Sequence, residues 1–446
     1  MRLYMDVERT ARLNLEDTDL VHKAVEVLEG NWLGHATRPS PRLYPHQWSW
    51  DAAFVAIGYA HYDQMKAEQE LRSLFRGQWS NGLLPHIVFA DGAEDYFPGP
   101  DFWQTTRSPY APRSPLTSGI VQPPLHATAA WHIYRYASDK EQARRFLAEI
   151  MPWLAAWHDY LSRERCRNED GLIEIWHPWE SGMDNSPLWD EALARVSPTE
   201  LPYVRRDVAA ADPGERPTDA DYDRYVHLIA VLRDNDYHPS RSRRVIPFAI
   251  SDVLYNSLFV QANRDLAEIA RLLGADASEF EGWADHTAEG IQTKLWDDDH
   301  ACYIDWNLID DQPIATRTGA AFSPLFAGIP TTDRAEAMVA QLTDHVGVKL
   351  DETTWMVPSY GSDEPGFLAT NYWRGPIWIN VNWVLERGLR RYGFTYRAES
   401  LRRAMVELPR RFGFFEHYDP TTGRGHGAEQ FAWTAALVLD LLFAEP

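Results

Sequence analysis

Apolar residues recur every three or four positions along most of the chain, which is the period of amphipathic α-helices. This spacing predicts helices over residues 15–29, 51–76, 122–137, 141–165, 246–273, 276–295, 332–344, 377–391, 396–408 and 429–443. Strand-like alternation is confined to short segments at 171–176, 301–306 and 413–418, the last followed by turn residues 419–423. Many helices and few strands in one continuous chain predict an all-α fold, an α-helical toroid.

No low-complexity linker divides the chain, so we expect a single domain over residues 1–446. The stretch 196–222 is rich in proline and acidic residues, but it is too short to separate two domains. We interpret it as part of an ordered loop or lid excursion over about residues 190–245.

The charge balance excludes several classes of partner. The chain carries 43 Lys and Arg against 65 Asp and Glu, a net charge of -22. Because nucleic-acid binding needs clustered cations, we expect no nucleic-acid partner.

The charged start, Met1–Leu20, and the absence of any run of about 18 apolar residues predict neither a signal peptide nor a membrane span. The two distant cysteines, Cys166 and Cys302, predict reduced thiols in a cytoplasmic protein.

Aromatic residues are more abundant than a core requires, with 19 Trp, 20 Tyr and 18 Phe. Four segments concentrate them just ahead of apolar helices, at 44–51, 176–184, 371–378 and 414–433. In a helical barrel the loops before alternate helices gather at one end, so these segments are expected to converge on one pocket. Flat rings interleaved with polar side chains suit a sugar. Aromatic caps on the end of the core remain the alternative for any single segment.

Two carboxylates in these segments are candidates for acid–base catalysis, and the first is Asp184. It lies between Gly182 and Ser186-Pro187, and Ser followed by Pro is a helix-start signature. A general acid must stay protonated, which requires apolar burial or a second carboxylate nearby. An Asp that only tightens the loop or caps the helix fits the same spacing.

The second candidate is Glu416. Alternation places Phe414, Glu416 and Tyr418 on one face, where poor solvation raises a carboxyl pKa toward that of a useful base. A partly exposed strand glutamate is the alternative. Glu429 is a rival of lower rank, because at the start of the last helix the helix dipole favours its ionised form.

Other chemistries lack their motifs. The chain has no phosphate-binding loop, no Gly-x-Ser-x-Gly elbow and no His-Glu-x-x-His zinc helix. Its 16 histidines show no metal-ligand spacing, and the acidic run 297–299 is typical of a solvated turn. We therefore predict neither a metal nor a cofactor.

The aromatic segments resemble the signature blocks of glycoside hydrolase family 63. The blocks are YPHQWSWD (44–51), WESGMDNSP (179–187), YWRGPIW (372–378) and EHYDPTTG (416–423). They are most similar to its small bacterial branch of mannosylglycerate and glucosylglycerate hydrolases, from about residue 40 to the C-terminus. The resemblance implies an (α/α)6 barrel with short β-hairpins and long loops at the active-site end. It also implies an inverting mechanism with Asp184 as general acid and Glu416 as general base.

The same resemblance implies a set of substrate-binding residues. They are Tyr44, Trp48, Ser49, Trp50, Asp51, Tyr96, Gln122, Trp179, Gly182, Arg216, Tyr222, Tyr372, Trp373 and Trp378. Arg216 would bind the glycerate carboxylate, because a planar guanidinium meets a carboxylate bidentately. Without the resemblance, a surface arginine in a proline-rich loop fits equally well.

The predicted partner is thus a small sugar acid, with glucosylglycerate and mannosylglycerate both open. Thr370-Asn371 departs from the charged residues of the family at this point and leaves the sugar or aglycone preference undecided. Two other functions remain as alternatives: an α-glucosidase or trehalase-like hydrolase of neutral disaccharides, and a non-catalytic sugar-binding barrel. The sequence also leaves open whether the chain forms a homo-oligomer.

Overall fold

Six helices pack side by side into a closed ring in the computed structural model, which describes residues 14–92, 96–351 and 354–444. In ring order they are α3 (Ser49–Tyr59), α6 (His126–Tyr136), α12 (Val253–Leu273), α14 (Pro324–Ala327), α16 (Ile379–Arg391) and α18 (Ala432–Phe443). Helix α18 packs against α3, so the end of the chain closes the ring.

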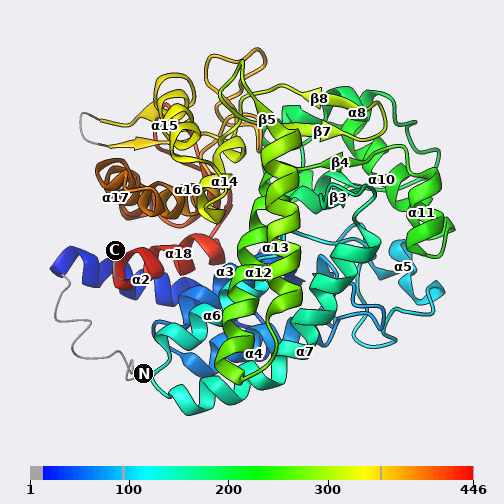
Figure 1. Ribbon diagram of the computed structural model, residues 1–446, viewed down its shortest axis with the longest axis horizontal. Coiled ribbons are helices and arrows are strands. Elements are labelled where there is room, and N and C mark those ends of the chain that lie inside the picture. The colour runs from blue at the N-terminus through cyan, green and yellow to red at the C-terminus, as the bar shows by residue number, and fades with distance from the viewer. Residues whose placement is uncertain (1–13, 93–95, 352–353, 445–446) are drawn as a thin grey trace.

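A second layer of helices surrounds this ring (Figure 1). It contains α2 (Leu15–Asn31) on α18, α4 (Gln64–Phe75) on α3, α7 (Lys140–Glu164) on α6, α13 (Ser278–Gly290) on α12 and α17 (Thr395–Phe412) on α16. Helix α15 (Thr332–Gln341) continues into residues 342–346, which contact the turn at 319–322 ahead of α14. Inner and outer helices alternate along the chain, which confirms the predicted all-α (α/α)6 barrel.

The two layers differ in how their apolar residues are arranged. Helix α3 is buried at every position and α18 over 432–441, as expected for helices that are apolar on all sides. Gly58 allows these two helices to approach closely, because a Cβ added there would lie 2.5 Å from the Cα of Ala436. Outer helix α7 instead buries one stripe that includes Phe146, Ile150 and Leu154.

Three predicted helix boundaries are wrong, each for a local reason. The segment 51–76 is two helices, because Asp63 caps α4 by accepting a hydrogen bond from the backbone N–H of Lys66. The segment 122–137 begins only at His126, after two prolines that lack a backbone donor. The segment 246–273 begins at Val253, because Asp252 caps α12 and residues 250–251 form a strand.

Short antiparallel sheets account for the predicted strand segments. Strands β3 (Glu174–Ile175), β4 (Ile250–Ser251), β7 (Asp305–Asn307) and β8 (Gln312–Ile314) form one sheet in that order, with Glu174 opposite Ser251. The pairs β1 (Gln47–Trp48) with β2 (Ile87–Val88), β5 (Trp296–Asp297) with β6 (Cys302–Tyr303), and β9 (Val348–Lys349) with β10 (Trp355–Met356) are smaller. The hairpin of β11 (Phe415–Tyr418) and β12 (Gly425–Glu429) immediately precedes α18.

The excursion between α7 and α12 is ordered and mostly helical. It contains α8 (Asp190–Ala194), α9 (Asp207–Ala210), α10 (Asp219–Asp234) and α11 (Pro239–Val245). Periodicity did not predict α10, although Thr218 and Asp221 form a capping box at its start. Asn371 ties the excursion to the barrel by donating a hydrogen bond of 2.7 Å to the carbonyl oxygen of Gly214.

In the described part of the chain, no helix combines the length and the apolar character needed to cross a membrane. Most of the segment for which we predict no signal peptide, residues 1–13, lies outside the described residues.

Candidate active site

A cavity lies at the end of the barrel where the inner helices begin. Its wall comes from the segments that lead into α3, α6, α16 and α18, from the loop after β3, and from the excursion. The four aromatic segments therefore meet in one place, as their position ahead of the helices predicts.

Every predicted site residue except Ser49 lines this wall. Those present are Tyr44, Trp48, Trp50, Asp51, Tyr96, Gln122, Trp179, Gly182, Asp184, Arg216, Tyr222, Tyr372, Trp373, Trp378 and Glu416. Ser49 begins α3 and is fully buried, with its Oγ 3.0 Å from Nε2 of His126 on α6. Its side chain therefore joins two inner helices and lies outside the wall, which differs from the prediction.

Four further residues complete the wall: Pro39, His86, Phe431 and Trp433. Phe431 and Trp433 belong to the fourth aromatic segment. His86 and Pro39 stand in no motif, and His86 reaches the wall because its ring stacks on Trp179 with centroids 6.2 Å apart. No signal in the sequence marks either residue.

The loop that carries Asp184 is held rigidly on both sides. Gly182 has a φ of 75°, and a Cβ added there would lie 2.5 Å from the Trp50 ring, so this position requires glycine. The Ser186 hydroxyl caps the short helix that begins at Pro187. Tyr225 donates a hydrogen bond of 2.9 Å to the backbone carbonyl of Asp184 itself. The Asp184 side chain is thus free to face the cavity. Capping of the helix, which was the alternative role for Asp184, is carried out by Ser186.

Burial raises the pKa of Asp184 to about 7. The positive charge of Arg216 opposes this rise, and the negative charge of Glu416 adds to it. A carboxyl group with this pKa holds its proton for much of the time near neutral pH, which suits a general acid.

Glu416 lies at an irregularity in the β11–β12 pairing and receives several hydrogen bonds. Its Oε1 accepts from the Tyr44 hydroxyl at 2.7 Å, and its Oε2 accepts from the backbone N–H of Ala428 at 2.9 Å. A Cβ at Gly427 would lie 2.5 Å from the same Oε2, so glycine makes room for the carboxylate.

The environment of Glu416 contains more stabilising groups than that of Asp184. Burial raises the pKa of Glu416 above its ordinary value, and Arg216, with Nη1 3.8 Å from Oε1, and the hydrogen bonds from Tyr44, Ala428 and Tyr372 limit this rise. These donors favour the ionised carboxylate, which is the form that a general base needs. The rival Glu429 is exposed on β12 and does not line the cavity.

Arg216 extends from the excursion into the site and is 5% exposed, so the interpretation as a surface arginine is wrong. Its Nε donates to Asp207 at 3.3 Å, and its Nη1 donates to the Tyr44 hydroxyl at 3.0 Å. The guanidinium lies 4.1 Å from the centre of the Tyr372 ring. This cation is therefore fixed in position beside both carboxyl groups.

Stacked rings form the remaining surface. Trp373 and Trp378 are parallel, with centroids 3.8 Å apart, and Trp378 packs edge-on against Trp433. Tyr372 adopts a φ of 43°, an uncommon conformation for a bulky residue. The backbone N–H of the next residue, Trp373, donates a hydrogen bond of 2.9 Å to Oδ1 of Asn185. Apolar ring faces beside carboxyl, amide and guanidinium groups can bind a polyhydroxylated ring.

Comparison with known proteins finds similarity to hydrolases of mannosylglycerate and glucosylglycerate. The family profile described as the mannosylglycerate hydrolase MGH1-like glycoside hydrolase domain matches residues 44–434. The chain is 46% identical to the mannosylglycerate hydrolase of Rubrobacter radiotolerans, covering 95% of this chain and 97% of that protein. It is 40% identical to the glucosylglycerate hydrolase of Mycolicibacterium hassiacum, covering 95% and 98%.

A solved structure is also similar. The GH63 mannosylglycerate hydrolase of Thermus thermophilus, in complex with Tris and D-glycerate, superimposes with a TM-score of 0.88 at 44% identity. The match covers 94% of this chain and 99% of that one.

Proposed function

The chain belongs to the glycoside hydrolases of the mannosylglycerate hydrolase MGH1-like family, and from this membership we propose that it cleaves hexosyl glycerates, glucosylglycerate or mannosylglycerate, to the hexose and glycerate. One observation carries the proposal. A carboxyl group with a pKa of about 7, Asp184, and a carboxylate stabilised by donors, Glu416, share one aromatic cavity with a buried arginine.

In the proposed reaction Asp184 gives its proton to the glycosidic oxygen as the bond to the anomeric carbon breaks. Glu416 takes a proton from a water that attacks that carbon from the opposite face. The hexose is released with inverted configuration, and glycerate leaves with the proton of Asp184 on its hydroxyl. Tyr44, which donates to Glu416, keeps the base oriented.

Arg216 binds the carboxylate of the glycerate in this proposal, together with Tyr222 and Gln122. The segment of about residues 190–245 then serves as the lid of the single catalytic domain, because it supplies both Arg216 and Tyr222 to the wall. The hydrogen bond from Asn371 to Gly214 supports this role, since it connects the lid to the Tyr372-Trp373 segment. We place the activity in the cytoplasm, which the free cysteines Cys166 and Cys302 support.

The direct test is hydrolysis of glucosylglycerate, mannosylglycerate and trehalose in parallel, with the first product anomer followed by NMR. We expect rapid release of the inverted hexose anomer from one or both glycerates and little hydrolysis of trehalose. Equal rates on trehalose would favour a hydrolase of neutral disaccharides. Binding without turnover would favour a non-catalytic barrel.

The pH dependence of kcat/KM should be bell-shaped and follow the two carboxyl groups. Activity is expected to fall as pH rises through about 7, because Asp184 loses the proton it must donate. On the acid side it should fall as Glu416 becomes protonated. A hexosyl fluoride needs no protonated leaving group, so its profile should lack the alkaline limb. An alkaline limb of equal size with the fluoride would contradict the role given to Asp184.

A further inference from the structure

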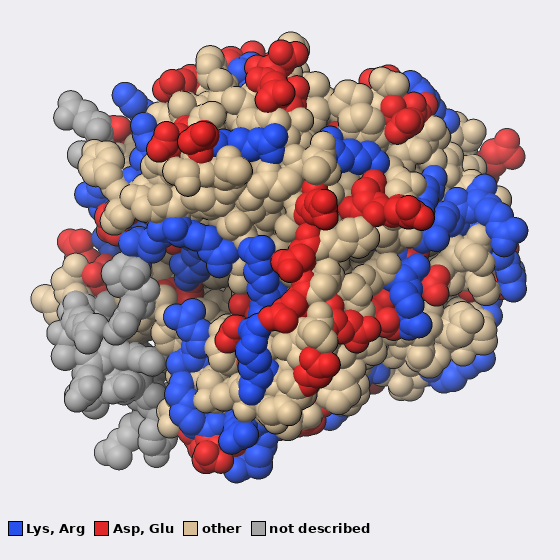
Figure 2. All heavy atoms as spheres, in the orientation of Figure 1, with Lys and Arg blue, Asp and Glu red and all other residues tan. Residues whose placement is uncertain are grey.

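A second cavity lies at the opposite end of the barrel, where the inner helices end. It is enclosed by α6, α12, α14 and α16 and has a volume of about 170 Å³. Figure 2 shows basic side chains around the hollow where α6, α16 and α18 meet. Three arginines, Arg135, Arg387 and Arg391, and two tryptophans, Trp131 and Trp383, line its wall.

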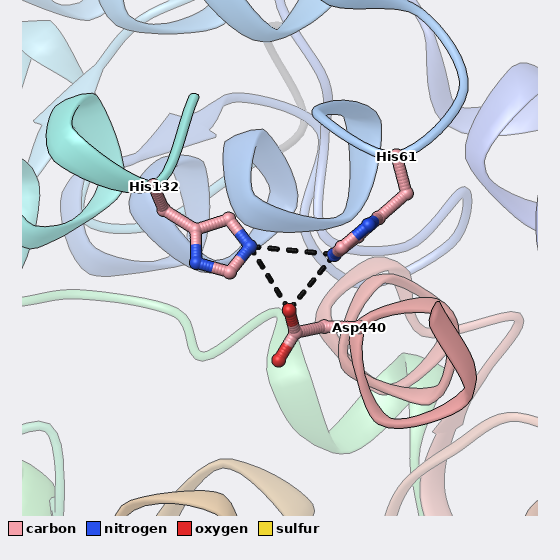
Figure 3. Close-up of side chains that lie close together, drawn as sticks. All are labelled: His61, His132 and Asp440. Carbon is pink, nitrogen blue, oxygen red and sulfur yellow. Dashed lines mark hydrogen bonds and ion pairs between the residues drawn. The ribbon is translucent and has the colours of Figure 1, made fainter. Parts of the chain in front are cut away.

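One of these arginines, Arg387, is already neutralised. It contacts Oδ2 of Asp440 and lies 3.0 Å from Oε2 of Glu386. Asp440 also accepts from Nε2 of His61 at 2.8 Å and of His132 at 2.9 Å, as Figure 3 shows. The positive charge of Arg387, followed by the two histidines, holds the pKa of the Asp440 carboxyl well below its usual range, so the carboxylate matches the charge of Arg387.

The convergence of His61, His132 and Asp440 also resembles the ligand set of a transition metal, since the two Nε2 atoms are 3.3 Å apart. The charges around this cluster disfavour the binding of a divalent cation. The single negative charge of Asp440 is already shared with Arg387, and a metal ion would be placed beside that guanidinium. We therefore interpret the cluster as the buried support that fixes Arg387.

The other two arginines are not neutralised in this way. Within the described residues, neither Arg135 nor Arg391 has a carboxylate within ion-pair distance. Asp265 is in the wall, where its two oxygens accept from the Thr128 hydroxyl at 2.6 Å and from Nε2 of Gln261 at 3.0 Å, and its charge acts on both arginines. Burial and the nearby Arg264 lower the pKa of Arg391, and the negative charge of Asp265 opposes this shift.

Helix termini explain only part of this arrangement. Arg135 and Arg391 lie in the last turns of α6 and α16, where the carbonyl ends of helices attract cations. Both residues are exposed and line the same cavity, in a protein with a net charge of -22. An anion bound in the cavity could pair with both guanidiniums.

We propose that this cavity is a second ligand site that binds a small oxyanion, a phosphate or sulfate group, through Arg135 and Arg391. A guanidinium binds such a group with two parallel hydrogen bonds. Trp131 and Trp383 would cover the apolar part of an organic phosphate. The site is separate from Asp184 and Glu416, so it does not depend on the proposed hydrolase activity.

The test is calorimetric titration of the full chain with inorganic phosphate at constant ionic strength, repeated with sn-glycerol 3-phosphate. We expect one site for phosphate whose Kd rises at least about tenfold in Arg391→Gln and in Arg135→Gln, because each loses charge-assisted hydrogen bonds. Arg271→Gln removes the same charge from an exposed position on α12 and should change the Kd less than about twofold. Tighter binding of glycerol phosphate would identify an organic phosphate as the ligand, and equal binding a free anion.

Three results would overturn the proposal. The first is an unchanged Kd in both arginine variants that melt like the wild type. The second is loss of phosphate binding in Arg216→Gln alone, which would place the anion in the catalytic cavity. The third is stoichiometric zinc that survives dialysis and is lost in His132→Gln, which would make the cluster a metal site.

Discussion

Replacing Asp184 with asparagine is expected to lower kcat on a hexosyl glycerate by about 10²- to 10⁴-fold, the usual contribution of a general acid. Asparagine keeps the size of the side chain but cannot donate the proton that the leaving oxygen needs. The loss should therefore depend on the leaving group. Steady-state rates with the natural glycoside should collapse, while a hexosyl fluoride, whose leaving group needs no protonation, should retain most of its rate.

Glu416→Gln gives the complementary result, because the attacking water needs a base whatever the leaving group is. We expect both the glycoside and the fluoride to lose about 10²- to 10⁴-fold in kcat. Glu429→Gln, on the same hairpin but exposed, is the matched control and should stay within about twofold of wild type. An Asp184→Asn enzyme as fast as wild type on the glycoside would refute the assignment, as would a glutamate control that falls with Glu416→Gln.

The ring of inner helices was predictable because α3, α12, α16 and α18 are buried over most of their length and therefore contain long stretches of apolar residues. Boundaries were less predictable. The apolar residues of 246–252 continue the period of α12, yet the side chain of Asp252 caps the N-terminus of the helix. Helix α12 therefore begins at Val253, and Ile250 and Ser251 pair with β3 and β7. Only the neighbouring strands, far away in sequence, decide that outcome.

The candidate site was predictable where a residue's place in the chain also sets its place in the barrel. Segments just ahead of α3, α16 and α18 must reach the same end, so their aromatic residues meet. What the residues do there depends on contacts between distant segments. The bond from Tyr44 to Glu416 joins residues 372 positions apart, and no local pattern predicts it.

The difference in environment behind the proposed acid and base roles was likewise beyond local sequence. Asp184 and Glu416 are both flanked by aromatic residues, and both were candidates for a raised pKa. The difference arises because Glu416 receives the backbone N–H of Ala428 and the hydroxyl of Tyr44. The support of Arg216 by Asp207 depends in the same way on the folded excursion.

Replacing Arg216 with glutamine is expected to lower kcat/KM for hexosyl glycerates by about 30- to 4000-fold. This equals the roughly 2–5 kcal/mol lost when one member of a buried charge pair is removed, here the partner of the substrate carboxylate. A neutral α-glucoside lacks that carboxylate and should lose much less. Arg241→Gln, an exposed arginine on α11 of the same excursion, is the control and should leave both substrates unaffected.

The pH profile separates this binding role from a merely structural one. Arg216 lowers the pKa of both Asp184 and Glu416, so its removal should move both limbs of the kcat/KM profile to higher pH. A structural role would lower the rates on anionic and neutral substrates equally and leave the limbs where they are. If that second pattern is found in a variant that melts like the wild type, Arg216 does not bind the substrate. The physical basis for a preference for a glycerate over a neutral sugar is then lost.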